Sequence, residues 1–466
     1  MDTIWSPMLE IGAGPKYLAL ARALRDAIRT GELDKGAKLP PVRDLAYRLN
    51  MTPGTVARAY QIVTQEGLLE ATVGRGTFVA LQEPRLGPRQ PIYSDRLQSK
   101  AAHVVDLQSP QLPDVGQPAI FSQILTKQSQ NINRDWLDYT TQAAEAPLRA
   151  SVIQWLSSRI LGPADADDVM LTLGGQNSLT LVMNCCLRGD RPVVLTEELA
   201  YPGFSYAARL SRAEVVGVEM DVEGILPEAL EATCKRYGPQ ILCLTPEIQN
   251  PTTARMSLQR RHAVTDIARR FDLQIIEDDC YVPRQTNLPS LRALAPERTW
   301  FLGSLSKSIS PALRFGYVIC PTGMGETGRL TAQHSFFALP LSLTSFVQEL
   351  FVSGAAEQIF GRVQGAIDQR VQLVVNRVGS YDLRWQAGMP FAFVHLPQGW
   401  RASSFARAAE DAGVLIRSAD QYALVHGRAP NAVRLAMACD HPLEDFDGAL
   451  VTLAGLLARP PSDMGV

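Results

Sequence analysis

The stretch from 303 to 318, GSLSKSISPALRFGYV, holds the side chains best suited to covalent chemistry. Lys307 follows a strand-like run, and a lysine amine buried at a strand end has a lowered pKa and becomes nucleophilic toward carbonyl carbon. The hydroxyls of Ser304 and Ser306 and the guanidinium of Arg314 are the donors that a phosphate group requires. Taken alone, a string of this kind more often contains an ordinary surface lysine than a nucleophilic one.

Two further strings predict groups that bind an anion and a flat ring. GGQNS, at 174–178, follows a strand-like run and opens a helix, so the amides of Gly175 and Gln176 predict an anion site at a helix N-terminus. An ordinary glycine turn is the alternative. Tyr201, in EELAYPG, either stacks on a flat ring or belongs to the core.

Polar residues also end two other apolar runs. Asn250 lies in TPEIQNPT, and Asp278 ends the run IIED before Cys280 and Tyr281. A carboxylate at the end of an apolar strand needs a partner. A protonated ring nitrogen is one candidate for Asp278, and a structural arginine is the other.

The elements that must position these residues alternate along the chain. Short, almost wholly apolar strands separated by helices predict a parallel sheet that is buried on both faces. A smaller α+β lobe should follow, with a long helix near 356–379. The predicted strands of the sheet are 193–197, 215–219, 241–245, 273–278, 300–304 and 315–321.

The N-terminal part has a different organisation. An amphipathic helix over 16–30 precedes a second helix after Pro40-Pro41 and a third after Thr52, a fair N-cap with Pro53 at the first helical position. Two strand-like runs flank Gly74-Arg75-Gly76. This order predicts a helix-turn-helix with a β wing.

Composition bounds the class of protein. The chain has 466 residues, of which 46% are apolar and 20% charged, so it is neither disordered, collagenous nor a coiled coil. No apolar run reaches the roughly 18–20 residues of a membrane helix, and no secretory signal is visible. The seven cysteines show no CxxC pairing, so we expect a cytoplasmic protein with reduced cysteines and no metal site.

The net charge of −2 hides an asymmetry. Residues 12–80 carry ten basic and six acidic residues, a sum of +4, and 81–100 carry four and two, a sum of +2. The first eleven residues carry two acids, so the remaining 366 must sum to −6. A basic head on an acidic body is a weak hint of nucleic-acid binding.

The ordered motifs GGQ, YPG, QNP, EDDxY, SxSK with an arginine seven residues later, and VRL together resemble a known architecture. The body resembles the fold type I, aspartate-aminotransferase-like proteins that bind pyridoxal 5′-phosphate (PLP). The head resembles the GntR-type winged helix. Joined in this order over residues 12–455, they resemble the MocR subfamily of bacterial transcription regulators.

The resemblance implies three parts. A winged helix-turn-helix (α+β) spans 12–80, a linker spans 81–103, and an α/β aminotransferase-like domain spans 104–458. Within that domain the large lobe covers about 165–340 and the small α+β lobe about 350–458. The resemblance to proteins of this fold also implies a homodimer.

The resemblance also implies a role for each candidate residue. Lys307 matches the lysine that forms the Schiff base with PLP, and Asp278 the carboxylate that keeps the pyridine nitrogen protonated. Tyr201 matches the aromatic residue that stacks on the ring. Arg434 matches the arginine that pairs with an amino-acid α-carboxylate. The remaining matches are Asn250 and Tyr281 for the ring hydroxyl, and Gly175, Gln176, Ser304, Ser306 and Arg314 for the phosphate.

For the head, the third helix is expected in the major groove. We expect Thr52, Thr55 and Arg58 to lie away from its apolar face and to contact DNA, and Arg43 matches an arginine that contacts phosphate or bases. Arg75 in the wing is expected to reach the minor groove. For each of them, a solvated surface side chain is the alternative.

Two functions remain open at this point. The first is a regulator whose body senses an amino acid, an amine or a vitamin B6 vitamer by aldimine exchange at Lys307 and changes the affinity of the head for double-stranded DNA. The second is an active class I/II aminotransferase with a winged-helix appendage. Both use the same residues, so the motifs do not separate them.

Overall fold

The computed structural model divides the chain into two compact units, Met1–Asp95 and Arg96–Val466, which we call the head and the body and describe separately. Among the described helices, none is both long enough and apolar enough to cross a membrane. The predicted linker, 81–103, and Arg75 lie outside the described residues. The structure describes residues 5, 7, 16–65, 68–72, 76–80, 104–281, 286–424, 429–437 and 439–459.

The head is a three-helix unit with a two-stranded wing. Leu20, Leu24, Leu45 and Val56 meet in one buried core, because each helix turns one apolar stripe inward. The two strands pair antiparallel. The elements are α1 (Lys16–Thr30), α2 (Val42–Arg48), α3 (Pro53–Gln65), β1 (Leu69–Thr72) and β2 (Gly76–Val79).

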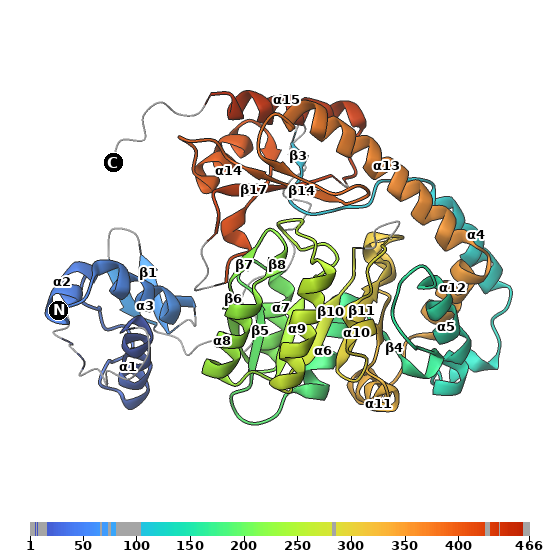
Figure 1. Cartoon of the computed structure of the whole chain (residues 1–466), viewed down its shortest axis with the longest axis horizontal. Helices are drawn as coiled ribbons and strands as arrows, with labels where there is room; N and C mark the ends of the chain where they lie inside the picture. The colour runs from blue at the N-terminus through green and yellow to red at the C-terminus, as the bar shows by residue number, and fades with distance from the viewer. Residues whose placement is uncertain are drawn as a thin grey trace. The chain divides into compact units, whose positions relative to one another are not determined.

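The large lobe of the body is built on a seven-stranded sheet (Figure 1). Five strands, β6, β5, β9, β10 and β11, run parallel as the sequence predicts. The run at 315–321 forms β12, which pairs antiparallel with both β11 and β4, so the sheet is mixed. In order across the sheet the strands are β4 (Val169–Thr172), β12 (Gly316–Ile319), β11 (Thr299–Ser304), β10 (Gln274–Asp278), β9 (Ile241–Leu244), β5 (Val193–Glu197) and β6 (Glu214–Val218).

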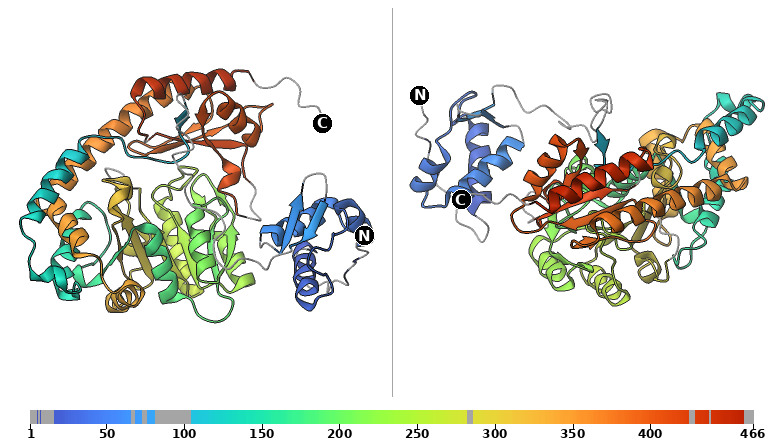
Figure 2. Two further views of the ribbon diagram at one scale, coloured as in Figure 1. Left: turned by 180° about the vertical axis from the view of Figure 1, so that it is seen from behind. Right: turned by 90° about the horizontal axis from the view of Figure 1, so that it is seen from above.

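Helices cover both faces of this sheet, as Figure 2 shows from behind and from above. Alternate residues of a strand point to opposite faces, so Ile276 packs with α6 and α7 while its neighbour Ile275 packs with α8 and α9. A short hairpin, β7 (Met220–Asp221) and β8 (Gly224–Ile225), precedes α8. The helices are α6 (Gly175–Cys186), α7 (Pro202–Leu210), α8 (Pro227–Tyr237), α9 (Leu258–Arg270), α10 (Leu291–Leu294) and α11 (Gly325–Phe336).

The small lobe packs a four-stranded sheet, ordered β13-β14-β17-β16, against helices. The long helix α13 (Ala355–Val378) packs on α15 and on α12, and so connects the small lobe with the large one (Figure 1). The other elements are β13 (Leu383–Arg384), β14 (Phe391–His395), α14 (Ala402–Asp411), β15 (Val414–Leu415), β16 (Arg417–Ser418), β17 (Ala432–Ala436) and α15 (Leu443–Leu457).

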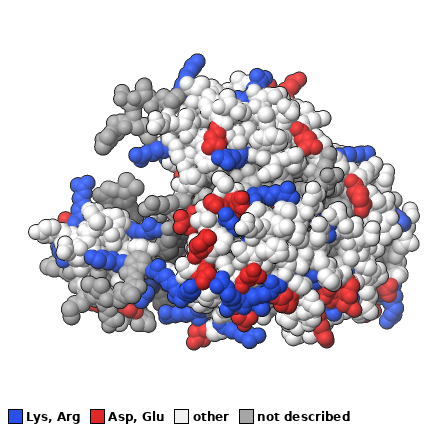
Figure 3. Space-filling view, in the orientation of Figure 1, with Lys and Arg blue, Asp and Glu red and all other residues white. Residues whose placement is uncertain are grey.

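Three helices and a short strand complete the body. The strand β3 (Val105–Asp106) pairs parallel with β15, which brings the start of the body to the small lobe. The helices α4 (Gln117–Ser129), α5 (Gln142–Trp155) and α12 (Leu341–Val352) pack together beside the large sheet. On the face of the body seen in Figure 3, acidic and basic side chains are interspersed.

Candidate functional site

Lys307 lies directly after the end of β11, in a short 3₁₀ turn (Leu305–Lys307). Burial lowers the pKa of its amine to about 8, and the positive charges of Arg434 and Arg314 act in the same direction. The amine donates a hydrogen bond to the carbonyl oxygen of Pro110 at 2.8 Å. A neutral lysine amine is a nucleophile at a pH near 8.

Asp278 faces the same side of the sheet as α6, because it follows Ile276 by two residues on β10. Burial raises the pKa of its carboxyl, and the Cys280 amide, which donates to Oδ1 at 3.0 Å, opposes that rise. Within the described part of the chain, no lysine or arginine pairs with Asp278. The buried Arg159 pairs with Asp279 on the opposite face.

The phosphate-type donors converge at the N-terminus of α6. Ser304 donates to Ser306 at 3.0 Å and accepts from the Ser306 amide at 3.1 Å, which fixes both hydroxyls beside the strand end. Arg314 folds over Gly174, where an added Cβ would lie 2.7 Å from its Nη2. Within the described residues, the guanidinium donates one hydrogen bond, to the Leu173 carbonyl at 3.1 Å.

Glycines leave room around the same helix end. A Cβ on Gly175 would lie 2.9 Å from the Cys280 sulfur, and one on Gly203 would overlap the Tyr201 ring. The Tyr201 hydroxyl donates to the Gln176 side-chain oxygen at 3.4 Å, and Gln176 donates to the Gly203 carbonyl at 2.9 Å. Tyr201 is half-buried and lies beside these phosphate-type donors, which we call the anion cup.

The small lobe contributes Arg434 from β17. Its Nη1 donates to Asn250 Oδ1 at 2.8 Å, and the Asn250 amide donates to the Tyr281 hydroxyl at 3.5 Å. The Tyr281 ring contacts Phe391 edge-on, with 5.0 Å between centroids. The structure therefore brings Asn250, Tyr281 and Arg434 into one chain of hydrogen bonds.

Sequence reasoning missed a backbone segment that accepts hydrogen bonds from two of these side chains. Arg434 Nη2 donates to the Gln108 carbonyl at 2.6 Å, and Lys307 donates to the Pro110 carbonyl. We call residues 108–110 the strap. Its contribution is made by carbonyl oxygens, which every residue carries, so no residue type in the sequence could have indicated it.

In the head, the predicted contacts occupy different settings. Thr52 Oγ1 accepts from the Thr55 amide at 3.3 Å, so Thr52 caps α3, and it lies 2.8 Å from Thr55 Oγ1. Arg43 is exposed on α2. Arg58 is half-buried, with its guanidinium 4.9 Å from the centre of the Tyr17 ring. Tyr47, 89% exposed on α2, is a surface aromatic that the sequence analysis did not single out.

Comparisons with known proteins fit this two-part geometry. Residues 16–79 match the gntR family of bacterial regulatory proteins, and residues 102–453 match aminotransferase class I and II. The uncharacterised HTH-type transcriptional regulator YdeF of Bacillus subtilis is 30% identical over 97% of this chain and 96% of its own length. The chain belongs to the MocR subfamily of GntR-type transcription regulators.

Two further proteins similar to this MocR-type chain are a regulator and an aminotransferase. The probable rhizopine catabolism regulatory protein MocR of Rhizobium meliloti is 25% identical over 72% of both chains. Among solved structures, the α-aminoadipate aminotransferase LysN of Thermus thermophilus superposes with a TM-score of 0.65 at 25% identity, covering 79% of this chain and 95% of its own.

The cofactor of the MocR-type body is pyridoxal 5′-phosphate, and the residues present fit it. Asp278 is a carboxylate without a cation in the described residues, as a ring nitrogen requires. The α6 amides, two serine hydroxyls and Arg314 form a donor set for a phosphate dianion. Lys307 supplies the amine that the aldehyde of this cofactor requires.

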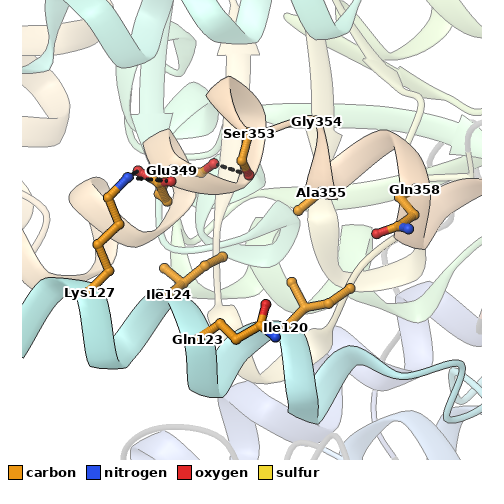
Figure 4. A pocket seen from close by; sticks show the side chains of 9 residues that line it. All are labelled: Ile120, Gln123, Ile124, Lys127, Glu349, Ser353, Gly354, Ala355 and Gln358. Carbon is orange, nitrogen blue, oxygen red and sulfur yellow. Dashed lines mark hydrogen bonds and ion pairs between the residues drawn. The ribbon is translucent and has the colours of Figure 1, made fainter.

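A groove of about 530 Å³ lies elsewhere, between α4 and the junction of α12 with α13 (Figure 4). Ile120 and Ile124 form its apolar wall, and the ion pair of Lys127 with Glu349, at 2.8 Å, spans one end. None of the predicted site residues lines it. The groove is therefore separate from the residues around Lys307.

Proposed function

We propose that the protein is a PLP-dependent regulator whose body senses an amino acid, an amine or a vitamin B6 vitamer at Lys307. The observation that carries the proposal is the buried Lys307 amine, with its pKa lowered to about 8 by burial and by the charges of Arg434 and Arg314. The same chain carries a winged helix, so a ligand event in the body has a DNA-binding head to act on.

Each side chain of the cleft then has one task. Lys307 holds the cofactor covalently, Asp278 accepts a hydrogen bond from its ring nitrogen, and Tyr201 stacks on the ring. When bound, the cofactor supplies an electron sink. Asn250 and Tyr281 donate to the ring oxygen. The phosphate is held by Gly175, Gln176, Ser304, Ser306 and Arg314.

The effector competes with the protein's own groups. Its primary amine takes the place of the Lys307 amine, and its carboxylate pairs with Arg434. Arg434 donates to the Gln108 carbonyl of the strap, so an effector carboxylate that pairs with Arg434 competes with that hydrogen bond. The Lys307 amine donates to the Pro110 carbonyl only while it is free, so this bond is absent when Lys307 holds the cofactor and forms again when the effector replaces the lysine. In this proposal the strap has two arrangements, and the change from one to the other alters the DNA affinity of the head.

The partners follow from the two units. We propose that the head binds double-stranded DNA in the cytoplasm and that a homodimer presents two heads to two half-sites. The proposed DNA contacts are Arg43, Thr52, Thr55, Arg58 and Arg75.

An active aminotransferase with a winged-helix appendage is the second candidate. The assembled set of Lys307, Asp278 and the hydrogen-bonded pair of Asn250 and Tyr281 favours it, because these are also the groups that transamination uses. LysN, the solved neighbour, is itself an α-aminoadipate aminotransferase.

One titration separates the two candidates. Amino acids, amines and B6 vitamers are added to the full chain with PLP, while visible absorption and affinity for the DNA upstream of its own gene are followed. A regulator gives one compound that changes both signals with the same midpoint. Accumulation of a keto product over many turnovers, with DNA affinity unchanged, would establish the aminotransferase instead.

A further inference from the structure

A second arginine lies next to Arg434 at the small-lobe end of the cleft. Arg417 on β16 is the direct cross-strand partner of Arg434 on β17 in an antiparallel register. Residues directly opposite each other in such a pair project from the same face of the sheet. Two positive charges in this arrangement repel each other and destabilise the pair unless an anion lies nearby.

Among the described residues, the hydrogen-bond acceptors of Arg417 are neutral. Its Nε donates to the Gln108 carbonyl at 3.1 Å, its Nη2 to Ser109 Oγ at 3.4 Å, and its Nη1 to Gln421 Oε1 at 3.4 Å. Arg434 donates to the same Gln108 oxygen. Throughout the described residues, no carboxylate forms an ion pair with either arginine.

Buried polar atoms beside the two arginines also lack partners. Arg434 is 3% exposed, and its Nε has no hydrogen-bond partner. The Tyr422 hydroxyl is likewise buried without a partner, and the Arg434 guanidinium lies 4.9 Å from the centre of its ring. Unsatisfied donors of this kind around two unpaired cations indicate a place for an anionic ligand.

The strap shows where the groups of such a ligand would lie. The Gln108 carbonyl oxygen accepts hydrogen bonds from both arginines and so lies where a carboxylate oxygen of the ligand would lie. The Pro110 carbonyl oxygen accepts from the Lys307 amine. A carbonyl dipole is a weak substitute for a full negative charge between two guanidinium groups. A ligand with carboxylates therefore gains more from this position than the strap does.

We infer that the effector is an amino acid with a second carboxylate on its side chain, and that Arg417 is the residue that selects it. Arg434 pairs with the α-carboxylate and Arg417 with the side-chain carboxylate. Two guanidinium charges are then balanced by two carboxylates, whereas a neutral amino acid leaves one unbalanced. This inference rests on the proposed function, because it names the ligand class of the same site.

The experiment compares isosteric ligands on the full chain with PLP. Glutamate with glutamine, and aspartate with asparagine, are titrated by calorimetry and by visible absorption. The wild type should bind the better acid about 10- to 100-fold more tightly than its amide, the value of a charge-assisted pair. Arg417→Gln should remove that preference while the affinity for the amide stays within about twofold.

Two companion variants make the result specific. Arg417→Lys keeps the charge without the planar fork and should retain part of the preference. Arg407→Gln removes an exposed arginine on α14 of the same lobe and should leave the preference unchanged.

The outcomes separate this inference from the proposed function. If Arg417→Gln weakens acid and amide equally, or if the wild type does not prefer the acid, Arg417 is not the selecting residue and the inference falls, while an amino-acid sensor stands. If no amino acid changes absorption or heat in any variant, the amino-acid form of the proposed function falls as well.

Discussion

Among the described residues, the proposed functional side chains of the head are exposed or half-buried, whereas in the body burial changes the acidity of Lys307 and Asp278. Arg43 and Thr52 meet solvent, while Lys307 has its pKa lowered and Asp278 its pKa raised by burial. The head therefore depends on charges that salt screens, and the body on desolvated groups whose protonation decides what they do. Changes in the body should accordingly have the larger effects.

The largest effect is expected for Lys307→Ala. This change removes the amine to which PLP is bound, so the visible absorption band of the lysine-bound cofactor should vanish completely. DNA binding without effector should remain, because the head folds around its own core. Absorption and DNA retention measured on one sample check both statements.

The matched control for that variant is Lys127→Ala, which removes an exposed lysine paired with Glu349 at the surface groove. Its absorption band should equal that of the wild type. An unchanged band in Lys307→Ala would show that another group binds the cofactor.

The pH dependence of cofactor uptake is the next largest effect. The pKa of Lys307 is about 8, below its ordinary value, so the amine is mainly protonated below pH 8 and mainly neutral above it. The uptake rate of PLP by the apoprotein should rise about tenfold per pH unit below pH 8 and level off above it. A rate that keeps rising to pH 10 would contradict the lowered pKa.

The smallest effect is expected in the head. Arg43→Ala removes one exposed charge, so DNA affinity should fall only about 3- to 10-fold, and the slope of log affinity against log salt should decrease by about one. The cofactor spectrum should not change. Equal affinity and slope in mutant and wild type would place Arg43 outside the interface.

Much of the body could be predicted because chemistry-bearing residues follow apolar strands. Asp278 ends β10 and Ser304 ends β11, and neighbouring parallel strands bring such ends to one edge of the sheet. The direction of β12 could not be predicted in this way. An apolar run has the same appearance in a parallel and an antiparallel strand, so the sequence predicts a sheet that is parallel throughout, whereas the sheet is mixed.

Details that depend on side-chain direction or on backbone atoms were also beyond the sequence. The helical pattern places Arg58 away from the apolar face, yet its guanidinium stacks on Tyr17 of α1. Arg417 gave no motif signal, because only the strand register places it opposite Arg434. The strap acts through carbonyl oxygens. Helix packing, strand register and backbone contacts, which sequence spacing does not contain, decide these three features.

The 24-residue helix α13 has a mechanical consequence. At about 1.5 Å per residue it is a rod roughly 36 Å long, so a tilt of about 5° displaces one end by about 3 Å. Arg362 on this rod donates to the Val115 carbonyl, and Arg370 to that of His441, whose ring accepts from the Asp106 amide. The segments on both sides of the strap are thus hydrogen-bonded to α13, directly or through His441. A displacement of the strap near Lys307 is therefore transmitted to a helix that reaches from one lobe to the other.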